Sequence, residues 1–180
     1  MAELIPDDDD SVVPPKRRGI VRLLDQLVTW WALSGGFVFV ALVVMSIVSI
    51  VGRKLFSAPI EGDMELLMMG AAVGSAAFLP VCEMHDHHIK VDALTTWMSE
   101  RGRALLDAVA HLLLMLAAAV ITWRTILYTL ECHENMEVSA LLLVPVWQPV
   151  SLMVPSFVLL AAAAFYRTLV STQLVLGVKP

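Results

Sequence analysis

The chain has 180 residues, of which 58% are hydrophobic and 16% are charged, and its mean hydropathy is +0.77. Soluble domains have about 25% charged residues, so this composition excludes an ordinary soluble domain and favours an all-α protein that crosses a membrane several times. The net charge of −5 leaves no basic surplus for binding nucleic acid, and two cysteines do not make a disulfide scaffold.

The chain begins with a tail, residues 1–21, that carries an acidic run at 7–10 and a basic run at 16–18. We expect this tail to be disordered and cytoplasmic. The first membrane span is predicted at about 27–52, because no residue between Asp25 and Arg53 is charged and about 20 apolar residues cross the hydrocarbon core. The apolar stretch is too long for a cleaved signal peptide and indicates a retained anchor helix.

Three further spans follow, at about 64–82, 104–130 and 141–167, which makes 22–168 a membrane domain with four transmembrane helices. The fourth run carries no charge from Val138 to Tyr166, but three prolines (Pro145, Pro149 and Pro155) lie in its first half. Proline interrupts helical hydrogen bonding, so these residues predict an irregular start and a regular helix from about Pro155. Residues 169–180 are predicted to form a cytoplasmic tail.

A polar segment separates the second and third spans. Within it, the apolar residues Val91, Leu94, Trp97 and Met98 recur at helical spacing. This pattern predicts a short amphipathic helix at about 91–100 that lies along the membrane surface, with Trp97 at the depth of the headgroups.

The basic residues predict the orientation. If the N-terminus is cytoplasmic, nine Lys and Arg residues lie inside and only Arg53 and Lys54 lie in the outer connections, with Arg124 within the third span. Positive charge accumulates on the cytoplasmic side of membrane proteins. We therefore expect both termini to be cytoplasmic.

Few residues of the sequence indicate a metal or cofactor site. His85, His87 and His88 lie close enough together for a zinc site to be conceivable, but their spacing is a weak match to known sites. His111, within the third span, is a candidate haem ligand without an evident second histidine at matching depth. A haem- or quinone-binding anchor subunit of a respiratory enzyme remains an alternative, as does a small stand-alone channel or exporter.

Charged residues within a membrane span need partners. Arg124 either extends towards the outer surface or meets Glu65, which opens the second span, and Arg53 is a second candidate partner for Glu65. Small residues, including Gly35, Gly70 and Gly74, favour close packing of helices and suit a subunit that docks onto a larger one.

Three segments carry a family resemblance. The first is Gly-Arg-Lys-Leu-Phe at 52–56 with Glu65 after it, and the second is His-Ile-Lys-Val-Asp at 88–92. The third is Ser-Ala-Leu at 139–141 with Pro-Val-Trp at 145–147. Together they resemble the small membrane subunit, DctQ-like, of the tripartite ATP-independent periplasmic (TRAP) transporters.

The resemblance implies a multi-pass protein of the bacterial inner membrane that is not an enzyme. It would scaffold a large permease subunit, in which sodium-driven uptake of an organic acid occurs, and a periplasmic solute-binding protein would deliver that acid. Sodium would bind to the large subunit, and this chain would hold no cofactor. Its remaining partners would be membrane lipids. The residues that the resemblance and the charge pattern mark for structure or partner contact are Arg53, Glu65, His88, Lys90, Asp92, Trp97, Arg124, Pro145 and Trp147.

Overall fold

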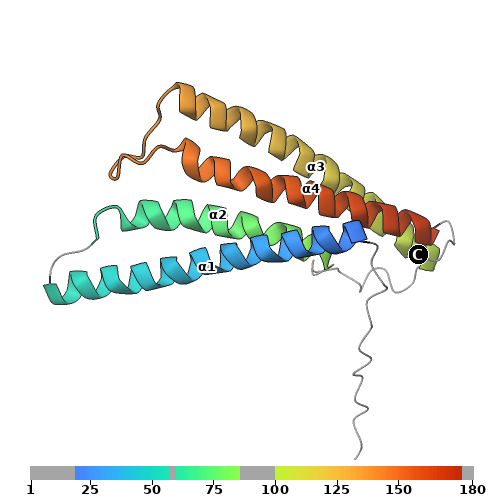
Figure 1. The fold of residues 1–180 in the computed structure, drawn as a ribbon, viewed down its shortest axis with the longest axis horizontal. Helices are drawn as coiled ribbons and strands as arrows, with labels where there is room; N and C mark the ends of the chain where they lie inside the picture. The colour runs from blue at the N-terminus through green and yellow to red at the C-terminus, as the bar shows by residue number, and fades with distance from the viewer. Residues whose placement is uncertain (1–18, 57–59, 86–99, 176–180) are drawn as a thin grey trace, which may run out of the picture.

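The structure is a computed structural model that describes residues 19–56, 60–85 and 100–175. Over these residues the chain forms four α-helices: α1 (Gly19–Phe56), α2 (Asp63–Met84), α3 (Glu100–Glu134) and α4 (Trp147–Val175) (Figure 1). Each of the four is long and apolar enough to cross a membrane. The prediction of an all-α membrane protein with four transmembrane helices is confirmed. The predicted surface helix at 91–100 lies outside the described residues except for Glu100.

The helices are longer than the predicted spans, since α1 begins at Gly19 and α4 continues to Val175. The prediction that regular helix begins near Pro155 is wrong, because α4 begins at Trp147 and contains Pro155. Pro149 falls in the first turn of α4, where an N–H group has no helical partner to lose. An isolated proline further along interrupts one hydrogen bond without ending a long apolar helix.

The helices run alternately in opposite directions (Figure 1). The end of α1, the start of α2, the end of α3 and the start of α4 lie at one end of the molecule, which we call the hairpin end (it includes residues 60–62 and 135–146). The start of α1, the end of α2, the start of α3 and the end of α4 lie at the other, which we call the terminal end. Both ends of the described chain therefore lie at the same end of the bundle.

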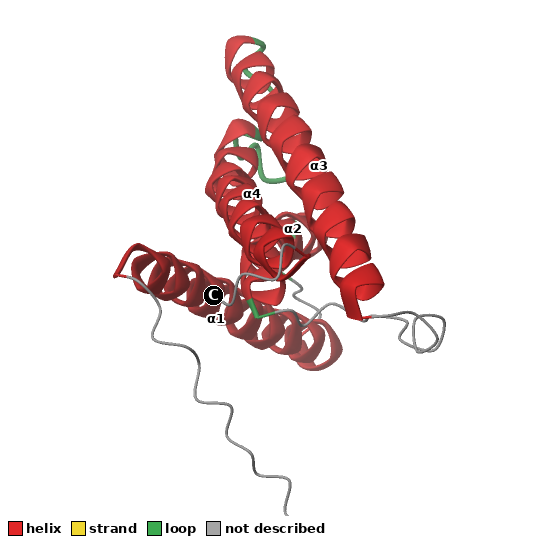
Figure 2. Cartoon of the chain, turned by 90° about the vertical axis from the view of Figure 1, so that its right-hand side faces the viewer, coloured by secondary structure: helices red, strands yellow, loops and turns green. Residues whose placement is uncertain are grey.

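The packing order differs from the chain order. Helix α1 packs on α2, α2 packs on α4, and α4 packs on α3. Figures 1 and 2 accordingly place α1 and α3 on opposite sides of the central pair formed by α2 and α4. Helices α1 and α3 each leave most of their surface free for lipid or a partner protein.

Small residues bring α1 and α2 together. A Cβ atom added to Gly35 would lie 2.7 Å from Ala77 Cβ, and one added to Gly74 would lie 2.8 Å from the ring of Phe39. A Cβ on Gly70 would similarly lie 2.8 Å from the side chain of Leu42. The glycines that suggested docking onto a larger subunit thus act inside this chain, where they allow two helix backbones to approach closely.

A compact core forms at the terminal end. Val28, Met84 and Ala163, from α1, α2 and α4, are buried against one another. Nearby, the indole N–H of Trp31 donates a hydrogen bond of 2.8 Å to the hydroxyl of the buried Ser156, which ties α1 to α4. Three of the four helices are thus held at this end by apolar packing and by one polar cross-link.

Candidate functional site

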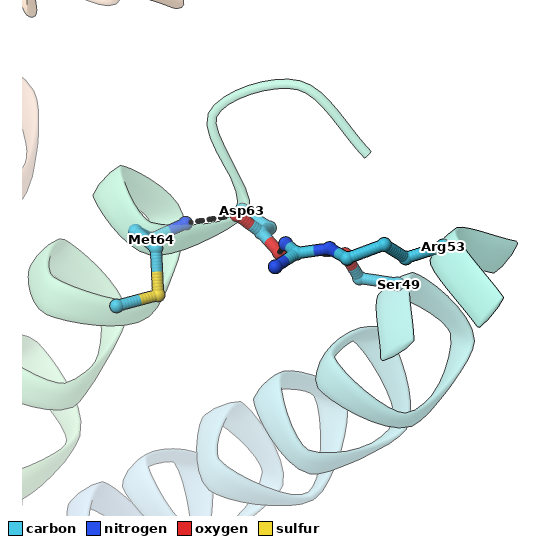
Figure 3. Close-up of polar contacts among 4 residues, drawn as sticks. All are labelled: Ser49, Arg53, Asp63 and Met64. Carbon is cyan, nitrogen blue, oxygen red and sulfur yellow. Dashed lines mark hydrogen bonds and ion pairs between the residues drawn. The ribbon is translucent and has the colours of Figure 1, made fainter. Parts of the chain in front are cut away.

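At the hairpin end, Asp63 joins the start of α2 to the end of α1 (Figure 3). Its Oδ2 atom accepts a hydrogen bond of 2.6 Å from the hydroxyl of Ser49 and lies 3.3 Å from Nη2 of Arg53. Its Oδ1 atom accepts a hydrogen bond of 2.8 Å from the backbone N–H of Met64. A carboxylate at a helix N-terminus also complements the helix dipole. This cluster fixes the angle between α1 and α2.

Glu65 holds the α3–α4 connection. Its two carboxylate oxygens accept hydrogen bonds from the backbone N–H groups of Leu141 and Leu142, at 2.9 and 3.1 Å. These residues are 76 and 77 positions away along the chain. Hydrogen bonds to an ionised carboxylate are stronger than those between neutral groups. Glu65 therefore clamps the α3–α4 connection onto the start of α2.

The clamped connection is itself an ordered turn. Val138 pairs with Pro145 in an isolated antiparallel bridge, and the backbone N–H of Ser139 donates to the carbonyl of Val144 at 2.9 Å. Leu142 of this turn covers Gly62, which has a φ of 73° and no space for a Cβ atom. Backbone geometry and shape thus reinforce the contact that Glu65 makes.

A different arrangement joins α2 to α3 at the terminal end. Nδ1 of His111 lies 2.6 Å from Oε1 of Glu83, and the two side chains are 7% and 0% exposed. Burying an ionisable group is costly unless it is paired. The hydrogen bond between these two residues is therefore a strong constraint on how α3 lies against the central helices.

A second pair lies at the same end. Nε2 of His85, which follows α2, lies 3.3 Å from Oδ1 of Asp25 on α1, and Nδ1 of His85 lies 3.2 Å from the carbonyl oxygen of Val81. Both side chains are partly exposed. Histidines next to carboxylates thus connect α2 to both of the outer helices.

The predicted site residues fall into three groups. Four of them lie at the hairpin end: Arg53, Glu65, Pro145 and Trp147, of which Trp147 begins α4 and packs its ring edge-on against His133 at 5.4 Å. Arg124 is exposed along α3. The remaining four, His88, Lys90, Asp92 and Trp97, lie outside the described residues, so their predicted roles stay predictions.

The predicted ion pairs of Glu65 do not form. Arg53 pairs with Asp63, and the carboxylate of Glu65 binds backbone N–H groups. Arg124 has no hydrogen bond or ion pair with any residue that the structure describes. Sequence inspection identified charged residues that need partners but could not anticipate that a distant turn would supply N–H groups.

Two residues with clear roles were missed. Glu83 falls just outside the predicted span 64–82, although it lies inside α2 and is fully buried. Asp63 falls just before the same span, although it begins α2. For Glu83 the available signal was its position directly after the uncharged run 66–82, together with a histidine, His111, at the matching end of the next span.

Within the described segments, no three His, Cys, Asp or Glu side chains are grouped so that they could hold a metal ion. His87 and His88 lie outside these segments, so the zinc hypothesis is not tested. His111 uses its Nδ1 atom to bind Glu83.

The fold and these contacts define a polytopic membrane protein whose polar residues join its own helices. Comparison with protein families matches residues 42–173 to the DctQ component of the tripartite ATP-independent periplasmic transporters. The chain belongs to this family and is a small-subunit component of a TRAP transporter, in the inner membrane, and the resemblance seen in the sequence is confirmed. No significant match was found among curated proteins or among solved structures.

Proposed function

We propose that this chain braces the large permease subunit of a TRAP transporter during sodium-driven uptake of an organic acid delivered by a periplasmic binding protein. The proposal rests chiefly on the division between the inside and the outside of the bundle. The polar contacts described above connect the chain's own helices, whereas large apolar side chains such as Phe37 and Trp123, 77% and 66% exposed, face outwards. A surface of this kind suits lipid and the membrane helices of a partner.

A brace must keep its shape while its partner moves. The helices of this chain are joined at both ends, by Glu65 at the hairpin end and by the Glu83–His111 pair at the terminal end. Attachment at two ends resists both splaying and sliding of the helices. On this proposal the large subunit holds the sodium and the substrate, and this chain holds no cofactor.

The proposal includes an orientation with both termini in the cytoplasm. It is supported by the excess of Lys and Arg on that side and by the position of Gly19 and Val175 at the same end of the bundle. Single cysteines placed at Val12, Lys90 and Glu134, in a chain without its two native cysteines, test it. We expect an impermeant thiol reagent added from the periplasm to label position 134 alone.

Reconstitution tests the function. Liposomes that contain the large subunit and this chain, with the binding protein and an organic acid outside, should accumulate the acid when sodium is higher outside. Liposomes with the large subunit alone, and liposomes with this chain alone, should accumulate far less. Equal uptake without this chain would show that the large subunit needs no brace, and uptake by this chain alone would show that it is a carrier in its own right.

A further inference from the structure

Arg124 is a charge without a partner in an apolar region of α3. Between Ala108 and Leu130 it is the only Asp, Glu, Lys or Arg residue. Its side chain is exposed and forms no hydrogen bond or ion pair within the part of the chain that the structure describes. A charged side chain near the middle of a bilayer is costly unless it is paired. A group outside the described residues is therefore needed to meet the guanidinium group.

The surroundings of Arg124 form a continuous apolar strip. At 3.6 residues per turn, Leu113, Ala117, Val120 and Tyr128 lie within about 40° of Arg124 around the helix axis. All four side chains are exposed. The strip faces away from α4, the neighbour on which α3 packs. Arg124 thus lies within a face of α3 that no described helix covers.

The direction of the side chain argues against contact with lipid phosphates. Arg124 lies ten residues before Glu134, the end of α3, which is about 15 Å along the axis. Cα–Cβ bonds of a helix tilt towards its N-terminus, so the stem of Arg124 starts out away from this nearer end. The other end of the span, Leu105, is about 28 Å away. The farther surface is therefore out of reach, and to reach the nearer surface the side chain would have to turn back along the helix.

We propose that this strip (Leu113, Ala117, Val120, Arg124 and Tyr128) is a docking face for the large permease subunit, which supplies a membrane-embedded carboxylate to Arg124. The proposal rests on the proposed function and adds a contact surface to it. Charge complementarity selects this occupant. A second copy of the chain, docked symmetrically through the same face, would bring two guanidinium groups together, and lipid chains offer no anion at this depth.

Substitutions at Arg124 test the charge. The chain is co-expressed with the large subunit and purified through an affinity tag, and the recovered large subunit is quantified. Arg124→Leu, which favours membrane insertion, leaves the partner carboxylate buried and unpaired, so recovery should fall about tenfold or more. Arg124→Glu should have at least this effect, Arg124→Lys should retain most of the recovery, and Lys54→Glu, at the exposed end of α1, should change nothing.

Photo-crosslinking tests the face. A benzophenone amino acid is placed at Leu113 or Tyr128, on the strip, and at Leu112 or Leu130, about 120° away at nearly the same depths. All four positions are exposed. We expect crosslinks to the large subunit from positions 113 and 128 and not from 112 and 130. Crosslinks from the control positions, or equally from all four, would overturn the proposal.

Failure of the proposed function and failure of the docking face would give different results. If the unaltered chain recovers no large subunit, the proposed function fails and the docking face fails with it. If the unaltered chain recovers the large subunit and Arg124→Leu does so equally well, only the docking face is wrong. Loss of bound phospholipid from Arg124→Leu without loss of the large subunit would assign the guanidinium to a lipid phosphate and would also overturn the proposal.

Discussion

The two ends of this bundle join helices by different physical means. At the hairpin end the carboxylates are partly exposed, and Glu65 binds backbone N–H groups of a turn. At the terminal end Glu83 is fully buried and binds the ring of His111. Water can replace a lost partner at the first end but not at the second. The consequences of removing one group should therefore differ, although both ends perform the same structural task.

The two ends of the bundle should also differ in how well they tolerate substitutions. A hairpin end fixed by hydrogen bonds to the backbone tolerates changes in the side chains of its turn, because Leu141 and Leu142 contribute N–H groups whatever their identity. The contact between α2 and α3 at the terminal end depends on two particular side chains, Glu83 and His111. We therefore expect substitutions at the terminal end to have the larger effects on stability.

The largest effect should follow His111→Ala. It removes the ring nitrogen that lies 2.6 Å from the buried carboxylate of Glu83, and breaking a buried pair by removing one member costs about 3–5 kcal/mol. Unfolding of the purified chain in detergent micelles, followed by circular dichroism, measures the loss. If His111→Ala lowers the free energy of unfolding no more than Glu65→Ala does, the proposed difference between the two ends is wrong.

The double substitution Glu83→Leu with His111→Leu is the control for this pair. Replacing both members of a buried pair by apolar residues is often neutral or stabilising. We therefore expect the double variant to be more stable than His111→Ala. If it is equally unstable, the pair contributes a specific interaction that apolar packing cannot replace.

A smaller effect should follow Glu65→Ala. Hydrogen bonds to an ionised carboxylate are stronger than those between neutral groups, but water can reach the amides once the clamp is gone, so the net loss of stability should be smaller than that caused by His111→Ala. Hydrogen exchange measures it directly, because the N–H groups of Leu141 and Leu142 should exchange faster. Amides in the middle of α4 are the internal control and should be unaffected.

The fold was predictable from the sequence to a greater extent than these contacts. Four long, predominantly apolar runs are enough to predict four membrane helices, because the bilayer imposes a length and requires every backbone group to be bonded. The start of α4 was mispredicted because Pro155 was given more weight than the apolar run around it. A proline in a long membrane helix costs less than its isolated propensity suggests.

The partners of the charged residues were not predictable in the same way. Arg53, Glu65 and Arg124 were correctly singled out as charges near or within spans, but the choice among partners depends on how helices are rotated about their axes. The hydrophobic pattern fixes that rotation poorly when all faces are apolar. For the same reason the meeting of Glu83 with His111 across two helices became visible only in the structure.

A third effect concerns shape at the hairpin end. Gly62 has a φ of 73°, and a Cβ atom there would lie 2.4 Å from Cγ of Leu142, so Gly62→Ala should cost about 1–3 kcal/mol through backbone strain alone. Gly36→Ala is the matched control, because its Cβ would meet only the ring of Phe78 at 3.6 Å and should be tolerated. Thermal unfolding of both variants gives the comparison. Combining Gly62→Ala with Leu142→Ala should remove the clash with the Leu142 side chain and restore that part of the lost stability. The part of the loss that comes from the backbone strain at position 62 should remain.

The smallest effect should follow Arg53→Ala. The side chains of Arg53 and Asp63 are 62% and 18% exposed, and ion pairs exposed to solvent contribute little to stability. Asp63 also keeps its hydrogen bonds from Ser49 and from the N–H of Met64, so α2 retains its start when the arginine is removed. Ser49→Ala should cost more than Arg53→Ala, because Ser49 is buried and its hydroxyl makes the shortest contact with Asp63. If Arg53→Ala is the more damaging of the two in thermal unfolding, the hairpin end relies on charge pairing as the terminal end does, and the distinction between the two ends is wrong.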